Sequence, residues 1–135
     1  MIKQTRDSSD FFKICDKLVE VKNCKLSANV LYGYLANQNT FTYVSSENDK
    51  PNGYLVLRLF KDNEDKVAML MTFSWIDAHY PKLFSEFSQL TDNKAKEEKA
   101  SRIYFVANRN EKMVERKTGK YGYKKAYSTY VKEVI

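Results

Sequence analysis

The sequence predicts a mixed α/β (α+β) fold, in which helices cover both faces of one mixed sheet. Two observations lead to this class. Segments that alternate at period two, as strands do, are interspersed with segments whose apolar residues recur every three or four positions, as in helices. In the last third of the chain a strand, a helix and a strand follow one another, which is the crossover that parallel strands need. The predicted order is β-α-α-β-β-β-α-β-α-β.

Length and composition fit one globular domain over residues 1–135. Hydrophobic residues make up 43% of the chain and aromatic residues 14%, which is enough for a single core. The net charge of +6 comes mainly from lysine. Such a charge suits phosphate-bearing partners, including nucleic acid and coenzyme A, and it is equally typical of a lysine-rich solvated surface.

The remaining composition bears on location and on metals. Cys15 and Cys24 lack the spacing of a disulfide framework, so we expect buried, reduced thiols in an intracellular protein. A single histidine gives no metal site. The chain has no apolar run near the roughly 18 residues that span a bilayer, and its start lacks a signal-peptide core. The expected location is the cytoplasm of a bacterial or phage-infected cell, or a virion.

The N-terminal part is predicted as a short strand followed by two helices. IKQT alternates, and Ser8 or Ser9 can cap a helix over 10–22 that has Asp10 in its first turn. Ser27 caps the second helix, over 27–37. We expect Gly33 in that helix to mark the close approach of another backbone. The predicted buried positions are Phe11, Ile14, Cys15 and Leu18 in the first helix, and Val30, Leu31, Tyr34 and Leu35 in the second.

Three strands near 41–46, 54–60 and 67–76 then form an antiparallel meander, because only short turn-rich segments separate them. ENDKPNG is predicted as an exposed hairpin loop, and KDNEDK as a second one. Pro81 fits the first turn of the next helix.

The C-terminal third begins with a strand at 102–107. Its unbroken apolar run predicts burial on both faces and parallel pairing with 67–76. A short basic helix ends at Gly119 and Gly122, and AYSTYVKEV is predicted as one closing strand.

This order, with an Asn-bearing loop after SRIYFV and a Tyr-Gly-Tyr turn at 121–123, resembles the GNAT (Gcn5-related N-acetyltransferase) superfamily over essentially the whole chain. The resemblance implies acyl transfer from coenzyme A to an amine. It further implies that the fourth and fifth strands splay apart and that pantetheine lies along Thr72–Ile76. If coenzyme A binding is retained, the implied contacts are Trp75, Ile76, Lys82, Asn108 and Asn110.

In active members a Q/R-x-x-G-x-G/A loop follows the fourth strand and holds the pyrophosphate at a helix N-terminus. The matching residues 77–83, DAHYPKL, contain no glycine. Pro81 lacks an N–H group, and Asp77 would repel a phosphate unless it turned away. Lys82 supplies one point charge, which does not replace a nest of amides.

The family also places a tyrosine four residues before a Gly-aromatic pair, where it protonates the departing thiolate. Thr118 occupies that position here, and threonine is a far weaker acid. Tyr121 lies nearby and is the remaining candidate acid. The general-acid position is therefore predicted to be lost.

Two residues at the end of the fourth strand are candidate bases. His79 would need an orienting carboxylate, which the sequence does not reveal, so a surface or capping role is the alternative. Asp77 can be a base, a turn residue or a helix cap. Trp75 and Tyr80 can line a pocket or pack in the core.

Three functions remain open. Damage to both cofactor motifs favours a non-catalytic binding or structural module with a protein partner and no cofactor, similar to GNAT-like phage proteins. The alternative is an active acetyl-CoA-dependent N-acetyltransferase. The third is a small basic nucleic-acid-binding protein that uses charge and stacking from Lys117, Lys120, Lys124, Lys125, Tyr121, Tyr123 and Tyr127.

Overall fold

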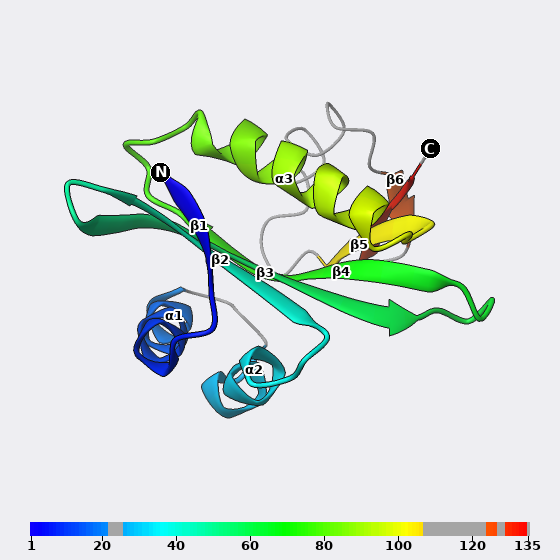
Figure 1. Cartoon of the computed structure of the whole chain (residues 1–135), viewed down its shortest axis with the longest axis horizontal. Helices are drawn as coiled ribbons and strands as arrows, with labels where there is room; N and C mark the ends of the chain where they lie inside the picture. The colour runs from blue at the N-terminus through cyan, green and yellow to red at the C-terminus, as the bar shows by residue number, and fades with distance from the viewer. Residues whose placement is uncertain (22–25, 107–123, 127–128, 135) are drawn as a thin grey trace.

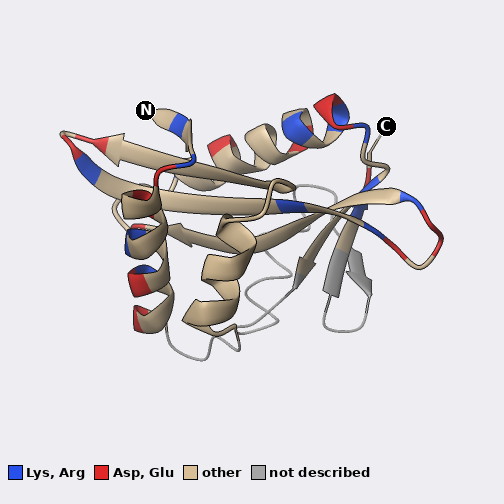
Figure 2. Cartoon of the chain, turned by 60° about the horizontal axis from the view of Figure 1, so that its bottom comes forward, with Lys and Arg blue, Asp and Glu red and all other residues tan. Residues whose placement is uncertain are grey.

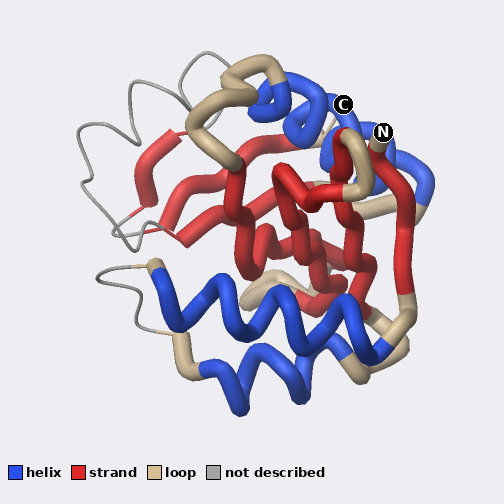
Figure 3. The backbone as a smooth tube through the Cα atoms, turned by 90° about the vertical axis from the view of Figure 1, so that its left-hand side faces the viewer, coloured by secondary structure: helices blue, strands red, loops and turns tan. Residues whose placement is uncertain are grey.

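The computed structural model describes residues 1–21, 26–106, 124–126 and 129–134. Within these ranges one mixed sheet has the strand order β1-β2-β3-β4-β5-β7-β6. Helices α1 and α2 lie against one face of the sheet and α3 against the other (Figures 1 and 3). The elements are β1 (Ile2–Thr5), α1 (Ser8–Glu20), α2 (Ala28–Leu35), β2 (Thr40–Glu47), β3 (Lys50–Lys61), β4 (Val67–Ile76), α3 (Leu83–Glu97), β5 (Arg102–Val106), β6 (Lys124–Ala126) and β7 (Thr129–Glu133).

The strand pairing confirms the predicted class. Strands β1 to β4 form an antiparallel meander. Strand β5 then pairs in parallel with β4, as the strand-helix-strand order requires, and it pairs antiparallel with β7. The predicted basic helix between these last strands lies outside the described residues.

Each face of the sheet has its own core. The core on the α3 side consists of Tyr43, Leu55, Leu57, Met69, Leu83, Phe87, Ala95, Ala100 and Ile103. The core on the α1–α2 side consists of Phe11, Ile14, Cys15, Leu18, Leu31, Leu35, Val44, Tyr54, Val56 and Phe73. Successive residues of β3 alternate between the two cores because side chains of a strand alternate between its faces.

The N-terminal helices follow the prediction with three corrections. Asp7, not Ser8 or Ser9, caps α1, since its carboxylate accepts a hydrogen bond from the Ser9 N–H at 2.9 Å. Val30 is 45% exposed because it lies one position, about 100°, before the buried Leu31. Among the described residues, no backbone from outside α2 lies within 4 Å of the place that a Cβ would take at Gly33, so none approaches it closely. Ser27 caps α2 as expected.

The first hairpin loop is much shorter than predicted. Only Asn48 and Asp49 connect β2 and β3, and both have positive φ, as the favoured two-residue turns require. Strand β3 therefore includes Pro51 and Asn52. Pro51 is tolerated because it pairs only with Ser46 of β2, before β4 begins to pair with β3 at Gly53.

The C-terminal strands differ from the prediction in two ways. The predicted closing strand is β7, and a further strand, β6, precedes it where a helix and turn were predicted; β6 and β7 pair antiparallel with each other. Strand β5 is not buried on both faces: Ile103 is fully buried on the α3 side, whereas Tyr104 and Phe105 are partly exposed. Tyr104 lies on the face opposite to Ile103, and its ring centroid is 5.6 Å from that of Phe60.

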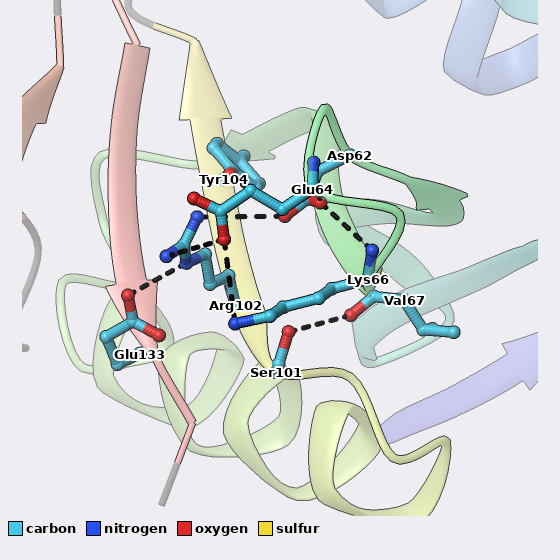
Figure 4. Close-up of polar contacts among 8 residues, drawn as sticks. All are labelled: Asp62, Glu64, Lys66, Val67, Ser101, Arg102, Tyr104 and Glu133. Atoms are coloured by element: carbon cyan, nitrogen blue, oxygen red, sulfur yellow. Dashed lines mark hydrogen bonds and ion pairs between the residues drawn. The ribbon is translucent and has the colours of Figure 1, made fainter.

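A polar cluster joins the second hairpin to the C-terminal strands (Figure 4). Arg102 forms ion pairs with Glu133 at 2.8 Å and with Glu64 at 3.3 Å. Asp62 accepts hydrogen bonds from the backbone N–H groups of Glu64 and Lys66, and these bonds close the β3–β4 hairpin. The cluster lies where β4 and β5 begin, so it fixes the start of their parallel pairing.

Charged residues gather on α1, on α3 and near the hairpin ends, as the coloured segments of Figure 2 show. None of the described helices is long and apolar enough to cross a bilayer. The described part of the chain also contains no group of three or more metal-ligating side chains.

Candidate functional site at the end of strand β4

Strand β4 loses one partner halfway along its length. It pairs with β3 up to Gly53 opposite Ile76, but its pairing with β5 ends at Met71 opposite Phe105. Among the described residues, Thr72–Ile76 therefore has no strand partner on the β5 side. An unpaired strand edge presents backbone N–H and C=O groups that can bind an extended ligand.

A bulge accompanies this change. Val56 pairs with Phe73 and Leu57 with Met71, so Thr72 is an extra residue in β4. An extra residue shifts the side-chain alternation of the strand, which bends at that point. Met71 consequently packs against the α3-side core, whereas Phe73 joins the core on the α1–α2 side.

The same shift separates two aromatic candidates. Trp75 packs on the α1–α2 side, where its ring centroid lies 5.5 Å from that of Tyr54 and 4.2 Å from Lys17 Nζ. Tyr80 packs against the α3-side core. The two rings therefore do not line a common pocket, and both serve packing.

The turn after β4 uses most of its own amides. The N–H of Asp77 donates to the Asn52 carbonyl at 2.8 Å, and that of Tyr80 donates to the Asp77 carbonyl at 2.9 Å. The N–H of His79 donates to Asp77 Oδ1 at 2.9 Å, and that of Leu83 to the Tyr80 carbonyl at 3.0 Å. Pro81 has no N–H to offer.

Asp77 and His79 form an exposed pair in this turn. Asp77 Oδ1 lies 2.8 Å from His79 Nδ1, while the side chains are 35% and 89% exposed, respectively. The hydrogen bonds from the backbone and side chain of His79 lower the pKa of Asp77. The sequence did not reveal an orienting carboxylate for His79, and the structure supplies one. Asp77 acts as a turn residue rather than a helix cap, since Lys82 is the N-cap of α3.

Helix α3 begins close to the sheet. A Cβ at Gly53 would lie 2.5 Å from Leu83 Cδ2 and 3.0 Å from Phe87 Cζ, so only glycine allows this approach. The helix starts two residues after Pro81, with an exposed Lys82 that has no side-chain capping bond. Asn52, beside this junction, is buried, and its Oδ1 atom has no hydrogen-bond partner among the described residues.

Comparison with known proteins decides the fold. No family model and no curated protein matches the sequence. Among solved structures, a chain of the NatC complex bound to Gag peptide and CoA matches with a TM-score of 0.81 and 12% identity, covering 100% of this chain and 98% of that one. A GNAT acetyltransferase from Staphylococcus aureus Mu50 matches with a TM-score of 0.76 and 12% identity, covering 100% and 99%. The ribosomal-protein-S18-alanine N-acetyltransferase from Escherichia coli matches with 0.76 and 8% identity, covering 99% and 93%.

The chain has the GNAT fold. At these identities the likeness concerns the fold alone. The resemblance seen in the order of strands and helices is thereby confirmed.

The GNAT fold implies acyl-coenzyme A, and this chain fits one half of that molecule. The unpaired edge of Thr72–Ile76 can bind the amides of a pantetheine arm, as an added strand would. The β4–α3 turn does not fit the diphosphate, because four of its N–H groups already donate to protein oxygens and Asp77 adds a negative charge. Lys82 is the cation at this end of α3.

Several predicted GNAT site residues lie outside the described residues. These are Asn108, Asn110, Thr118 and Tyr121, together with the lysines and tyrosines of the suggested nucleic-acid site except for the backbone of Lys124 and Lys125. The structure therefore brings together Asp77 and His79 and places Ile76 and Lys82 nearby. Trp75 instead packs against the core on the α1–α2 side.

The sequence did not single out two polar residues, Asn52 and Tyr43. Asn52 resembled a loop residue, because Pro51 and Gly53 flank it in a turn-rich run. Tyr43 resembled an ordinary core aromatic. The useful signal for Tyr43 was in α3, where Glu86, Asn93 and Glu97 recur at seven and four residues and mark one polar face.

Proposed function

We propose that this chain is a GNAT-fold binding module that does not turn over acetyl-coenzyme A. The β4–α3 turn carries this proposal. In a catalytic site, the diphosphate needs several free amides at the helix N-terminus. Here the N–H groups of Asp77, His79, Tyr80 and Leu83 already donate within the turn or to β3.

The electrostatics of the turn support the same proposal. Asp77 stays ionised because its pKa is lowered, so a carboxylate remains beside the position that a diphosphate would occupy. Lys82 offers a point charge but cannot replace a set of amides directed at phosphate oxygens. The expected ligand of the module is a partner protein.

Two observations favour the alternative, an active acetyl-CoA-dependent N-acetyltransferase. The open edge of Thr72–Ile76 could bind pantetheine, and the Asp77–His79 pair presents an imidazole that could accept a proton. In that case Lys82→Ala should weaken acetyl-coenzyme A binding by about 1–3 kcal/mol, as expected for a lost charge-assisted contact.

The test compares acetyl-coenzyme A with pantetheine. We expect acetyl-coenzyme A to leave the unfolding temperature unchanged, or to stabilise the protein no more than pantetheine does, because the diphosphate finds no cradle. We also expect no amine-dependent release of free thiol. Amine-dependent release at about 1 s⁻¹ or faster, the lower end for ordinary enzymes, would overturn the proposal. So would stabilisation by about 2.7 kcal/mol, the value for a ligand at 100 times its dissociation constant, with no such effect from pantetheine.

A further inference from the structure

A groove of about 400 Å³ runs along α3, on the side that faces β2. Tyr43 of β2 forms its floor, and the α3 wall includes Glu86, Leu90, Asn93 and Glu97. It is separate from the turn after β4, because no residue of that turn lines it.

Tyr43 gives this groove a polar group without a partner. The residue is only 7% exposed, and its hydroxyl forms no hydrogen bond with any other described residue. Burial, with smaller effects from Glu97 and Glu98, raises the pKa of Tyr43 to about 12. The hydroxyl therefore stays protonated near neutral pH and can donate a hydrogen bond to a ligand carbonyl. Tyr43 lines the groove, so a ligand that lies there can accept this hydrogen bond.

The charges of the groove favour a cation. Glu86 and Glu97 are exposed on the α3 wall. Lys94, the cation among the lining residues, is already engaged: its Nζ lies 3.2 Å from Glu97 and 4.3 Å from the centre of the Phe41 ring, and its side chain is 11% exposed. Glu97 shares its charge with Lys94, so the three charged residues that line the groove together carry −1, in a chain whose net charge is +6.

The geometry favours an extended ligand. Glu86 and Glu97 are separated by about 16 Å along the helix, at 1.5 Å per residue. In an extended peptide, residues four positions apart lie on the same side and about 13 Å apart. The reach of long basic side chains covers the remaining distance between the two carboxylates. Strand β1 borders β2, and its outer edge has no strand partner among the described residues. Its Gln4 pairs with Tyr43 and so lies on the same face.

We propose that the α3–β2 groove binds an extended peptide segment of a partner protein that carries two lysine or arginine residues four positions apart. The basic side chains meet Glu86 and Glu97, and the peptide backbone meets the Tyr43 hydroxyl. A nucleic acid is disfavoured because its phosphates would face the same carboxylates. This inference rests on the binding role proposed above and names the surface and the class of partner.

The test uses a fluorescein-labelled nine-residue peptide with two lysines four positions apart in an alanine-serine background. We expect saturable binding by the full chain, measured by fluorescence anisotropy, and weaker binding in high salt. The double variant Glu86→Gln, Glu97→Gln should lower the affinity at least about tenfold, a loss typical of two charge-assisted contacts. A peptide with glutamates in place of the lysines should not bind.

The matched control is Asp49→Asn, Asp65→Asn, which changes the net charge by the same amount at two hairpin tips. Both positions have positive φ, where asparagine is well tolerated. This control should bind the lysine peptide as the wild type does. Tyr43→Phe, which keeps the ring, should weaken binding about fivefold. Thermal unfolding verifies that each variant is folded.

The proposal is overturned if the lysine peptide does not bind, or if the Glu86/Glu97 variant and the control bind it equally. It is likewise overturned if the glutamate peptide binds as well. Acetyl-coenzyme A turnover with intact peptide binding would contradict only the non-catalytic role. If the protein shows neither acetyl-coenzyme A turnover nor peptide binding, only the proposal that the groove binds a peptide is contradicted.

Discussion

At the scale of single residues, Gly53 controls how closely α3 packs on the sheet. We predict that Gly53→Ala destabilises the protein by about 1–3 kcal/mol, as overpacking a filled core does. The added methyl group would lie 2.5 Å from Leu83 Cδ2 and 3.0 Å from Phe87 Cζ, and both of those residues are buried. The free energy of unfolding in urea measures the effect.

Gly33→Ala is the matched control, and its expected sign is opposite. Gly33 lies inside α2 with open space where the methyl group would be. Alanine should therefore stabilise the protein by up to about 1 kcal/mol through helix propensity. Equal destabilisation by both substitutions would contradict the packing described for Gly53.

Sequence reasoning succeeds for residues whose role is local. Ser27 was predicted as a helix cap because a cap depends only on its own turn. The burial of Asn52 was not predictable, since it depends on how β3 meets β4. The pairing of Asp77 with His79 joins residues two positions apart and was missed although it is local. Gly33 shows the reverse error, because a glycine in a helix need not mark a contact.

At the scale of elements, the cluster around Arg102 makes the β3–β4 hairpin sensitive to acid. The backbone N–H groups of Lys66 and Glu64, Arg102 and the Tyr104 hydroxyl together lower the pKa of Asp62. Its folded pKa thus lies below its unfolded value, near 3.8. The stabilisation is present above that unfolded value and is lost as the pH falls through the folded one.

We predict that Asp62→Asn makes the protein less stable near neutral pH and flattens the decline in stability below about pH 4. Asparagine can keep the hydrogen bonds from the hairpin amides but loses the charge that faces Arg102. Urea unfolding between pH 3 and pH 7 measures the difference. Asp49→Asn, at the tip of the other hairpin, should leave the slope nearly as in the wild type. If the decline of stability with falling pH is the same in Asp62→Asn as in the wild type, the Asp62 carboxylate does not contribute to the acid sensitivity.

The elements themselves were largely predictable because period-two and helical spacing reflect burial on one or both faces. Strand β4 matches its predicted bounds, whereas β3 starts earlier than expected because turn-forming residues can sit in a strand beside a bulge. Strand β6 was missed, since two lysines and an alanine are not typical of strands. The bulge at Thr72 was also missed, as nothing in an apolar run shows which residue is unpaired.

At the scale of the whole molecule, the GNAT order was predictable while the candidate site was only partly so. The missing glycines of the turn after β4 were visible in DAHYPKL. One of its amides, that of Asp77, donates to Asn52, which is distant in sequence, so this bond was not visible there. The α3–β2 groove likewise joins residues of two elements, so its acidic character emerges only when the helix is placed on the sheet.

The two cores predict an order of local stability that hydrogen exchange can measure. Strand β3 pairs along both edges, and its neighbouring residues Val56 and Leu57 are each 0% exposed, one toward each core. Exposing their amides requires β3 to separate from both neighbouring strands, so they should exchange only through global unfolding. Strand β1 pairs along one edge, with Lys3 and Gln4 exposed, and should open locally. We therefore expect peptides covering Leu55–Arg58 to exchange slowest and those covering β1 to exchange much faster. Equal protection of the two strands would mean that the sheet opens as a single unit, which the one-sided pairing of β1 argues against.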